Sequence, residues 1–506
     1  MKPKSWLQTL GGRLSIACSS WLILLLLPAL PVVVPAQDYT YTTNAGTITI
    51  TRYTGSGSAV TIPNTINDLP VTSIGDFAFS SSTSLTSVRI PNSVTHLGDW
   101  AFFECTSLAS VTLPDSLTRI GAWAFELCTS LTSITIPDSV TSLGNLSFYA
   151  CTGLTNITIP NSVTHLGSSA FEHCTSLSTV TIGNGLTILT ISAFRYCTNL
   201  TTVAIPSSVT NLGAWAFFEC SGLTNVALPN SLTSIGPWAF ELCTSLNSIV
   251  IPDSVISLGN LAFYACTSLT NITIPNSVTN LGSSAFGRCT SLATATIGNG
   301  VTIVTDSAFY YCTNLTTVTI PNSVTNIGDW AFFGCSALTN VALPNSLTSI
   351  GAWAFELCTS LTSIALPDSV TSLGNLAFYA CSNLTGVYFR GNAPGLGSSV
   401  FEYDNSATVY YLPGTTGWGP TFGGRPTVLW KPEIQTSDGS FGVQTNRFGF
   451  NVTWASGRVI VVEACTNLAN PFWSPLQTNT LAGDAFYFSD PEWTNYPGRF
   501  YRLRSP

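Results

Sequence analysis

The sequence predicts a solenoid, a stack of similar coils, that is followed by a small all-β module. An apolar pattern recurs every 23 residues, in which Leu131, Ile134 and Ile136 follow Cys128. Short strand-like runs after residue 440 lie outside this period. A fixed period of this size indicates coils that pack only on their neighbours. Cysteine marks the period without a slip at Cys105, Cys128, Cys151, Cys174, Cys197, Cys220, Cys243, Cys266, Cys289, Cys312, Cys335, Cys358 and Cys381.

Each coil is expected to contribute one strand to a parallel β-strand face. Alternation along the strand points Ser133 and Thr135 outward, between buried isoleucines. Pro137 ends the strand, and Gly144 turns the chain again. The segment 145–150 is too short for a full helix, so we expect a short helical or 3-10 turn on the convex side.

The first 36 residues are predicted to be a secretory signal peptide. Lys2, Lys4 and Arg13 precede an apolar run that ends in Val-Pro-Ala, with cleavage expected after Ala36. An uncleaved membrane anchor is the alternative. No later stretch is apolar for long enough to span a bilayer, so no membrane span is expected after cleavage.

Residues 37–62 alternate polar and β-branched side chains around a Gly/Ser turn, which predicts two short strands. We assign them to an N-terminal β cap, because a solenoid needs its first coil covered. The solenoid is predicted over residues 63–415.

The recurring pattern IPxSVTxLGxxAFxxCTSLTxI resembles the BspA-like leucine-rich repeat family of bacterial surface and secreted proteins. The resemblance covers about residues 63–413. It implies a right-handed leucine-rich repeat solenoid and an extracellular binding or adhesion role, and it does not imply catalysis. The pattern is broken at Gly183 and Gly298, which replace a proline, and at Thr190 and Thr305, which replace a glycine. Those coils are expected to bend or bulge.

The sequence also has a longer period, which spans five of the 23-residue repeats. GAWAFELC at 121–128 recurs as GPWAFELC at 236–243 and GAWAFELC at 351–358, a spacing of 115 residues or five coils of 23. This regularity indicates duplication of a five-coil block.

Residues 416–440 mix Gly, Pro, Thr and Ser and are predicted to be the cap end and a linker. Residues 441–506 are predicted to form a small β-sandwich-like module. They resemble C-terminal modules of other secreted bacterial repeat proteins. The module is expected either to contact the cell wall or to serve as a simple end domain.

The mature chain, residues 37–506, has 13 Lys and Arg against 24 Asp and Glu, a net charge of −11. Nucleic-acid binding needs clustered basic residues, so we expect no nucleic-acid partner. The sequence contains no HExxH motif, nucleophile elbow or phosphate-cradling glycine loop. We therefore expect a non-catalytic protein without a cofactor or a metal site.

The cysteines of an exported chain usually suggest disulfides. Here the thirteen ladder cysteines occupy equivalent places in coils that stack about 4.8 Å apart, whereas bridged Cβ atoms lie about 3.8 Å apart. We therefore predict buried free thiols.

Outward strand positions give the first set of candidate binding residues, on the concave strand face. Their small uncharged side chains suit hydrogen bonding to a protein or a glycan, although Ser and Thr are also ordinary soluble strand formers. Positions without threonine argue against ice binding. The candidates are Ser133, Thr135, Asn156, Thr158, Thr179, Thr181, Asn271, Thr273, Thr317 and Thr319.

Tryptophans at one position of the coil give the second set, with glutamates on the same turns. Aromatic rings beside carboxylates suit sugar stacking or protein contacts, and packing between convex turns is the alternative. The residues are Trp100, Trp123, Trp215, Trp238, Trp330, Trp353, Glu126, Glu241 and Glu356.

These features predict a secreted or cell-surface binding or adhesion protein that recognises an extracellular protein or a polysaccharide through its solenoid. The alternative is a structural cell-envelope component retained through residues 441–506. A glycan-active enzyme would need a single cleft with paired carboxylates.

Overall fold

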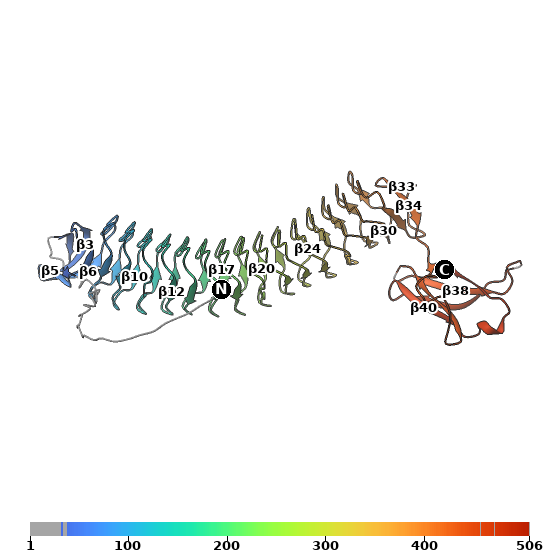
Figure 1. Ribbon diagram of the computed structural model, residues 1–506, viewed down its shortest axis with the longest axis horizontal. Coiled ribbons are helices and arrows are strands. Elements are labelled where there is room, and N and C mark those ends of the chain that lie inside the picture. The colour runs from blue at the N-terminus through green and yellow to red at the C-terminus, as the bar shows by residue number, and fades with distance from the viewer. Residues whose placement is uncertain (1–31, 34–37, 456, 470, 505–506) are drawn as a thin grey trace, which may run out of the picture.

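A computed structural model describes residues 32–33, 38–455, 457–469 and 471–504. It shows a long, gently curved row of stacked coils with a separate β module at the C-terminal end (Figure 1). The predicted solenoid of 23-residue coils with a small all-β module is confirmed. The predicted signal peptide lies outside the described residues, except for β1 (Val32–Val33), which pairs in parallel with β4 (Ala59–Thr61).

An antiparallel hairpin of β2 and β3 covers the N-terminal end of the stack, and β3 pairs in parallel with β6. Tyr53 stacks on Phe79 with 5.2 Å between ring centroids, and Tyr39 contacts the same ring at 6.4 Å. The hairpin therefore shields the first ring of the core. The elements are β2 (Tyr39–Asn44), β3 (Thr47–Tyr53), β5 (Thr65–Ile66) and β6 (Leu69–Ile74).

One side of the coils, which we call the long strand face, is built from parallel strands of three to five residues. It begins with β4, inside the range expected for the cap. The others are β7 (Ser87–Arg89), β9 (Ser110–Thr112), β12 (Asn156–Ile159), β14 (Thr179–Ile182), β16 (Thr202–Ala204), β18 (Asn225–Ala227), β21 (Asn271–Thr273), β23 (Thr294–Thr296), β25 (Thr317–Thr319), β28 (Ser363–Leu366), β30 (Gly386–Phe389), β32 (Thr408–Tyr411) and β34 (Arg425–Leu429).

A second parallel ladder, the short strand face, was not predicted, because two residues are too few to show a period. Its strands are β8 (His96–Leu97), β10 (Arg119–Ile120), β11 (Ser142–Leu143), β13 (His165–Leu166), β15 (Ile188–Leu189), β17 (Asn211–Leu212), β19 (Ser234–Ile235), β20 (Ser257–Leu258), β22 (Asn280–Leu281), β24 (Ile303–Val304), β26 (Asn326–Ile327), β27 (Ser349–Ile350), β29 (Ser372–Leu373) and β31 (Gly395–Leu396).

The turn face, residues 99–105 and their equivalents, differs in detail from the expected helical or 3-10 turn. Trp100 and Glu104 have positive φ angles of 54° and 58°, and the following coils repeat left-handed residues at both positions. Alternate amides therefore point at the next coil: Trp100 N–H donates to the Ala122 carbonyl at 2.9 Å and Glu104 N–H to the Glu126 carbonyl at 2.8 Å. A helix needs negative φ throughout, so consecutive turns take its place.

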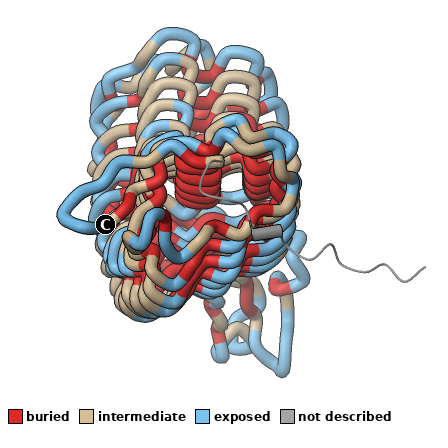
Figure 2. Tube along the Cα trace, turned by 90° about the vertical axis from the view of Figure 1, so that its left-hand side faces the viewer, coloured by how far each residue is buried: buried red, intermediate tan, exposed pale blue. Residues whose placement is uncertain are grey.

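Phenylalanine rings form the centre of the core, which we call the Phe ladder. One ring per coil, from Phe79 to Phe401, stacks on the next at 4.9–5.7 Å between centroids. Viewed along the stack, the buried residues line the inside of the coil (Figure 2).

The ladder cysteines pack beside these rings as free, buried thiols, as predicted. The Cys128 thiol donates to the Phe102 carbonyl at 3.2 Å, and every ladder cysteine from Cys105 to Cys381 makes the same bond at 3.1–3.3 Å. The thiol thereby satisfies a carbonyl of the neighbouring coil inside the core.

The coils with unusual residues do not bulge in the strand pairings of β14 and β23, which proceed without a register shift. Without the proline, Gly183 N–H donates to the Ile159 carbonyl at 2.9 Å and lengthens the ladder. The hydroxyl of Thr190 donates to the Gly167 carbonyl at 3.0 Å, and Thr305 makes the equivalent bond. The expectation of a bulge is therefore wrong for these pairings.

The last coil carries Asp404 where earlier coils carry the ladder cysteine. Its side chain is buried, and neither carboxyl oxygen has a hydrogen-bond partner. Burial raises the pKa of this carboxyl to about 7, although the nearby Arg425 guanidinium opposes the shift. β33 (Thr421–Phe422) and β34 close this end, where Phe422 packs on Phe389 at 5.4 Å.

The C-terminal module has two antiparallel sheets around its own core, which includes Phe450, Trp454, Ile460 and Phe488. The all-β character expected of this module is confirmed. β34 and β35 lie in the predicted cap end and linker 416–440. The module's elements are β35 (Glu433–Ile434), β36 (Gly442–Gln444), β37 (Arg447–Thr453), β38 (Val459–Cys465), β39 (Ser474–Thr480), β40 (Ala485–Asp490), the 3-10 turn η2 (Trp493–Asn495) and β41 (Phe500–Arg504).

The burial of the thiols predicts that the native chain resists alkylation. Burial raises the pKa of the ladder thiols, so little reactive thiolate forms at neutral pH. We expect iodoacetamide to leave the native chain 37–506 unmodified and to add 14 labels in guanidinium, as read by intact mass. Rapid labelling of a few thiols under native conditions would contradict the closed stack.

The buried Asp404 predicts a pH-dependent stability. Its pKa rises on folding from the ordinary 3.8 to about 7, so the folded state holds more protons between these values. The free energy of unfolding therefore falls as pH rises through this window. Asp404→Cys, which restores the ladder residue, should stabilise the chain by roughly 2 kcal/mol at about pH 8 and by little near pH 4.

Urea unfolding followed by circular dichroism at both pH values checks this expectation. Asp138→Asn, on an exposed turn, is the control and should leave the pH dependence unchanged. An equal effect of Asp404→Cys at both pH values would show that the carboxyl does not titrate on folding.

Candidate binding surfaces

The long strand face carries two columns of outward side chains, as the sequence predicted. Parallel pairing places Asn156 beside Thr179 and Thr158 beside Thr181. We call the column with Asn156 the first column and the column with Thr158 the second column. These side chains are exposed, whereas Ile157 between them is buried.

The predicted face is divided into separate sheets. Ser133 and Thr135 point outward, but residues 131–137 of the described chain form no strand, so the strand expected there is wrong. The ladder is interrupted again at 246–251. The structure therefore brings the other candidates together in two groups. One is Asn156, Thr158, Thr179 and Thr181, and the other is Asn271, Thr273, Thr317 and Thr319.

The tryptophans lie on the turn face as three stacked pairs, five coils apart. The ring centroids are 4.4 Å apart for Trp100 and Trp123, 4.7 Å for Trp215 and Trp238, and 4.6 Å for Trp330 and Trp353. Stacking uses at least one face of each ring, which supports the packing alternative. The outer rims stay partly accessible, and Trp330 is 36% exposed.

Glu126, Glu241 and Glu356 occupy one equivalent position on the coils of the second tryptophan of each pair. Partial burial raises the pKa of all three carboxyls, and that of Glu241 to about 7. The Glu356 Oε2 atom is buried without a hydrogen-bond partner. Because five coils separate successive members by about 24 Å, these glutamates do not form a pair.

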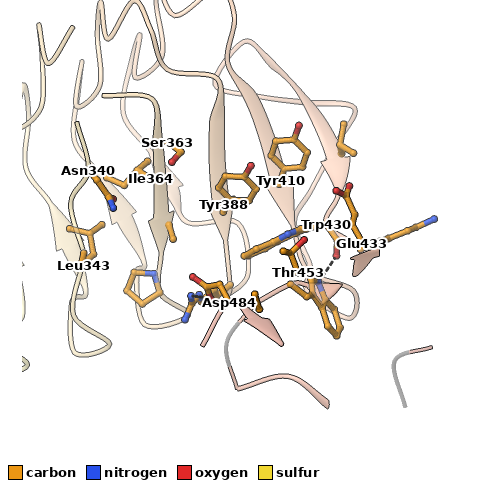
Figure 3. A pocket seen from close by; sticks show the side chains of 18 of the residues that line it. Asn340, Leu343, Ser363, Ile364, Tyr388, Tyr410, Trp430, Glu433, Thr453 and Asp484 are labelled. Carbon is orange, nitrogen blue, oxygen red and sulfur yellow. Dashed lines mark hydrogen bonds and ion pairs between the residues drawn. The ribbon is translucent and has the colours of Figure 1, made fainter. Parts of the chain in front are cut away.

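A further surface, which the sequence did not reveal, lies where the module meets the long strand face. This interdomain groove encloses a cavity of about 1180 Å³ (Figure 3). The solenoid contributes first- and second-column residues of its last coils, and the module contributes β35, β37 and the turn before β40. Residues that line both sides include Asn340, Ser363, Tyr388, Trp430, Glu433 and Asp484.

Aromatic rings form one end of the groove. Tyr388 stacks on Tyr410 with 4.8 Å between centroids and 11° between planes, and Trp430 lies 4.8 Å from Tyr388 at 52°. The Tyr388 ring leans over Gly386, where a Cβ atom would come within 2.6 Å of it. Glycine at this first-column position therefore makes room for the ring.

Direct contacts hold the module against the solenoid. The Arg390 guanidinium pairs with Asp484 at 3.2 Å, and Trp454 Nε1–H donates to the Trp430 carbonyl at 3.1 Å. Trp430 N–H in turn donates to the Tyr411 carbonyl at 2.7 Å. The ion pair and the hydrogen bonds to the Trp430 and Tyr411 carbonyls therefore hold the two walls of the groove together.

Sequence reasoning missed the groove because its residues are spread from 340 to 485. The one available signal was the second column, where Tyr388 and Tyr410 follow the small residues Ala342 and Ala365.

No cluster of three or more His, Cys, Asp or Glu residues suited to a metal ion occurs in the described part of the chain. The described residues also include no helix with the length and apolar character of a membrane span.

A family model described as a BspA type leucine rich repeat region, with six copies, matches residues 72–201, 187–316 and 302–417. A solved leucine-rich repeat protein from Bacteroides ovatus is 33% identical, with 74% of this chain and 98% of that chain covered and a TM-score of 0.67. A leucine rich cell surface protein from Faecalibacterium prausnitzii is 30% identical, with 72% and 96% covered and a TM-score of 0.44. No curated protein matches the chain.

The stacking pattern predicts unequal effects of removing two tryptophans. Trp100 stacks on Phe77 at 4.8 Å as well as on Trp123, whereas Trp330 has one ring partner, Trp353. We expect Trp100→Ala to cost about 3–4 kcal/mol of unfolding free energy and Trp330→Ala about 1–2 kcal/mol.

Urea unfolding of the full chain measures both losses. Alanine has the same steric limits at the left-handed φ of both positions, so backbone strain cancels in the comparison. Ser169→Ala, at the equivalent position without a ring, should change little. Equal losses for the two tryptophan variants would contradict a role of the second ring contact.

Proposed function

We propose that this chain, which belongs to the BspA-type leucine-rich repeat family, is an exported, non-catalytic binding protein. Its partner is an extracellular protein or a polysaccharide that lies along the long strand face. The observation that carries this proposal is the pair of exposed columns of small, mostly uncharged side chains. The predicted signal peptide and the family's extracellular character support export.

The form of the long strand face suits recognition of an extended partner. Short side chains such as Thr181 and Thr319 lose little rotamer entropy when a partner orders them. One coil offers little contact area, whereas stable interfaces bury roughly 1,600 Å² in total. Affinity therefore has to be collected over several coils, which favours a macromolecule over a small ligand.

The spacing of the partly buried carboxylates supports a role without catalysis. Glycosidases place two carboxyl groups about 5–9.5 Å apart. Glu126, Glu241 and Glu356 are separated by about 24 Å per step. Their raised pKa values have a sufficient cause in burial beside the turn-face aromatics.

Arginine substitutions on the long strand face test the proposal. Arg89 occupies the second column in β7, which shows that the face accepts this side chain. We expect the chain to bind at least one component of an array of extracellular-matrix proteins and polysaccharides. Thr181→Arg combined with Thr319→Arg should weaken that binding at least about tenfold by blocking the columns.

Ser142→Arg on the short strand face is the matched control, because Arg119 occupies the equivalent position one coil earlier. It should leave binding unchanged. Absence of binding to every component, or equal loss in the control, would contradict the proposal. If the chain binds only cell-wall material and the face variants have no effect, the envelope component retained through residues 441–506 takes its place.

A further inference from the structure

We propose that the interdomain groove binds a neutral glycan, with one sugar ring stacked on Tyr388. This inference deepens the proposed function, on which it rests, by assigning a ligand class to the C-terminal end of the long strand face.

At Tyr388 the second column changes from small residues to aromatic residues. Tyr410 covers one face of Tyr388 at 4.8 Å between centroids. On the opposite side lie the coils with Ala365 and Ala342, whose methyl groups leave the space above the strand open. A flat ring placed on the Ala365 side of Tyr388 would therefore contact Tyr388, with the tilted Trp430 ring 4.8 Å from Tyr388 as a further aromatic neighbour.

Polar and aromatic side chains together surround the space beside Tyr388. Asn340 and Ser363 lie on one side of Tyr388, and Trp430, Glu433 and Thr453 lie on the other (Figure 3). A pyranose has an apolar C–H face for the aromatic rings and a rim of hydroxyls. Amide and hydroxyl groups both donate and accept hydrogen bonds, and the Glu433 carboxylate accepts them, so together they match such a rim.

The charged side chains in the groove balance each other. Glu433 and Asp484 bring two carboxylates to the groove, and Arg390 and Lys431 bring two cations. Arg390 is engaged with Asp484 at 3.2 Å, so the groove offers little net attraction for an anion. A phosphorylated or uronic-acid ligand is therefore disfavoured relative to a neutral one.

The length of the groove suits a short chain of sugar rings. The groove runs from the coil of Asn340 to that of Tyr410, three coil steps or about 14 Å. The module contributes Trp430, Glu433 and Asp484 to the lining, so the groove is bounded by both the solenoid and the module. A chain of a few sugar rings fits this length.

Affinity electrophoresis of the full chain in gels that contain neutral polysaccharides (laminarin, mannan, xyloglucan or dextran) tests the inference. We expect retardation by at least one of them. Tyr388→Thr, which restores a residue common in the column, should weaken it at least tenfold. Ala365→Arg, which fills the space beside Tyr388, should do the same.

Tyr403→Asn is the matched control. Tyr403 is 57% exposed and lies on the turn face, in the turn that follows Tyr388 along the chain. Asparagine tolerates its left-handed φ of 68°. It should keep the retardation. The inference is overturned if no neutral polysaccharide retards the chain or if Tyr388→Thr and Ala365→Arg bind as well as the unmodified chain. Retention by a gelatin gel alone would identify an extended peptide as occupant and would also overturn it.

The Thr181→Arg and Thr319→Arg chain separates the two proposals in the same gels. If an array partner is lost in that chain while polysaccharide retardation never occurs, the groove assignment fails and the proposed function stands. If retardation depends on Tyr388 but not on Thr181 or Thr319, the groove assignment stands and recognition by the columns farther from the module fails.

Discussion

Contact between one coil and the next is the interaction on which the rest of this structure depends. A single coil has too few residues to enclose its own apolar side chains. Phe102 is buried because Phe79 and Phe125 cover its two faces, and the Cys128 thiol reaches the Phe102 carbonyl of the preceding coil. Most main-chain bonds on the three faces follow the same step and tie a residue to its equivalents 23 positions away.

This dependence explains which parts of the fold the sequence could predict. A 23-residue step leaves its mark in every coil, so Cys105 and the inward isoleucines could be found by counting. The short strand face and the left-handed turns could not, because Trp100 and Glu104 are neither glycine nor asparagine and carry no local signal of positive φ. Bonds to the neighbouring coil impose that backbone on whatever residue stands there.

The candidate surfaces, too, could be predicted only in part from the sequence. Column positions such as Thr158 and Thr181 follow from strand alternation, whereas the interruption at Ser133 has no sign in the sequence, which keeps the strand pattern there. The groove was beyond sequence reasoning, because its walls meet only after the module folds back against coils whose residues lie up to about 150 positions earlier. Its single local trace was Tyr388 in a column of small residues.

The departures from the repeat that build the groove lie at the C-terminal end, and this placement has a physical reason. A stack must end somewhere, and near this end Trp418 and Phe422 pack on Phe389. Tyr388 pairs in register with Tyr410 of a coil that also departs from the repeat, so both residues can differ without disturbing the stack. Departures from a consistent pattern are where functional sites are expected. The end of a solenoid is thus the place where a repeating sequence can build a site that does not repeat.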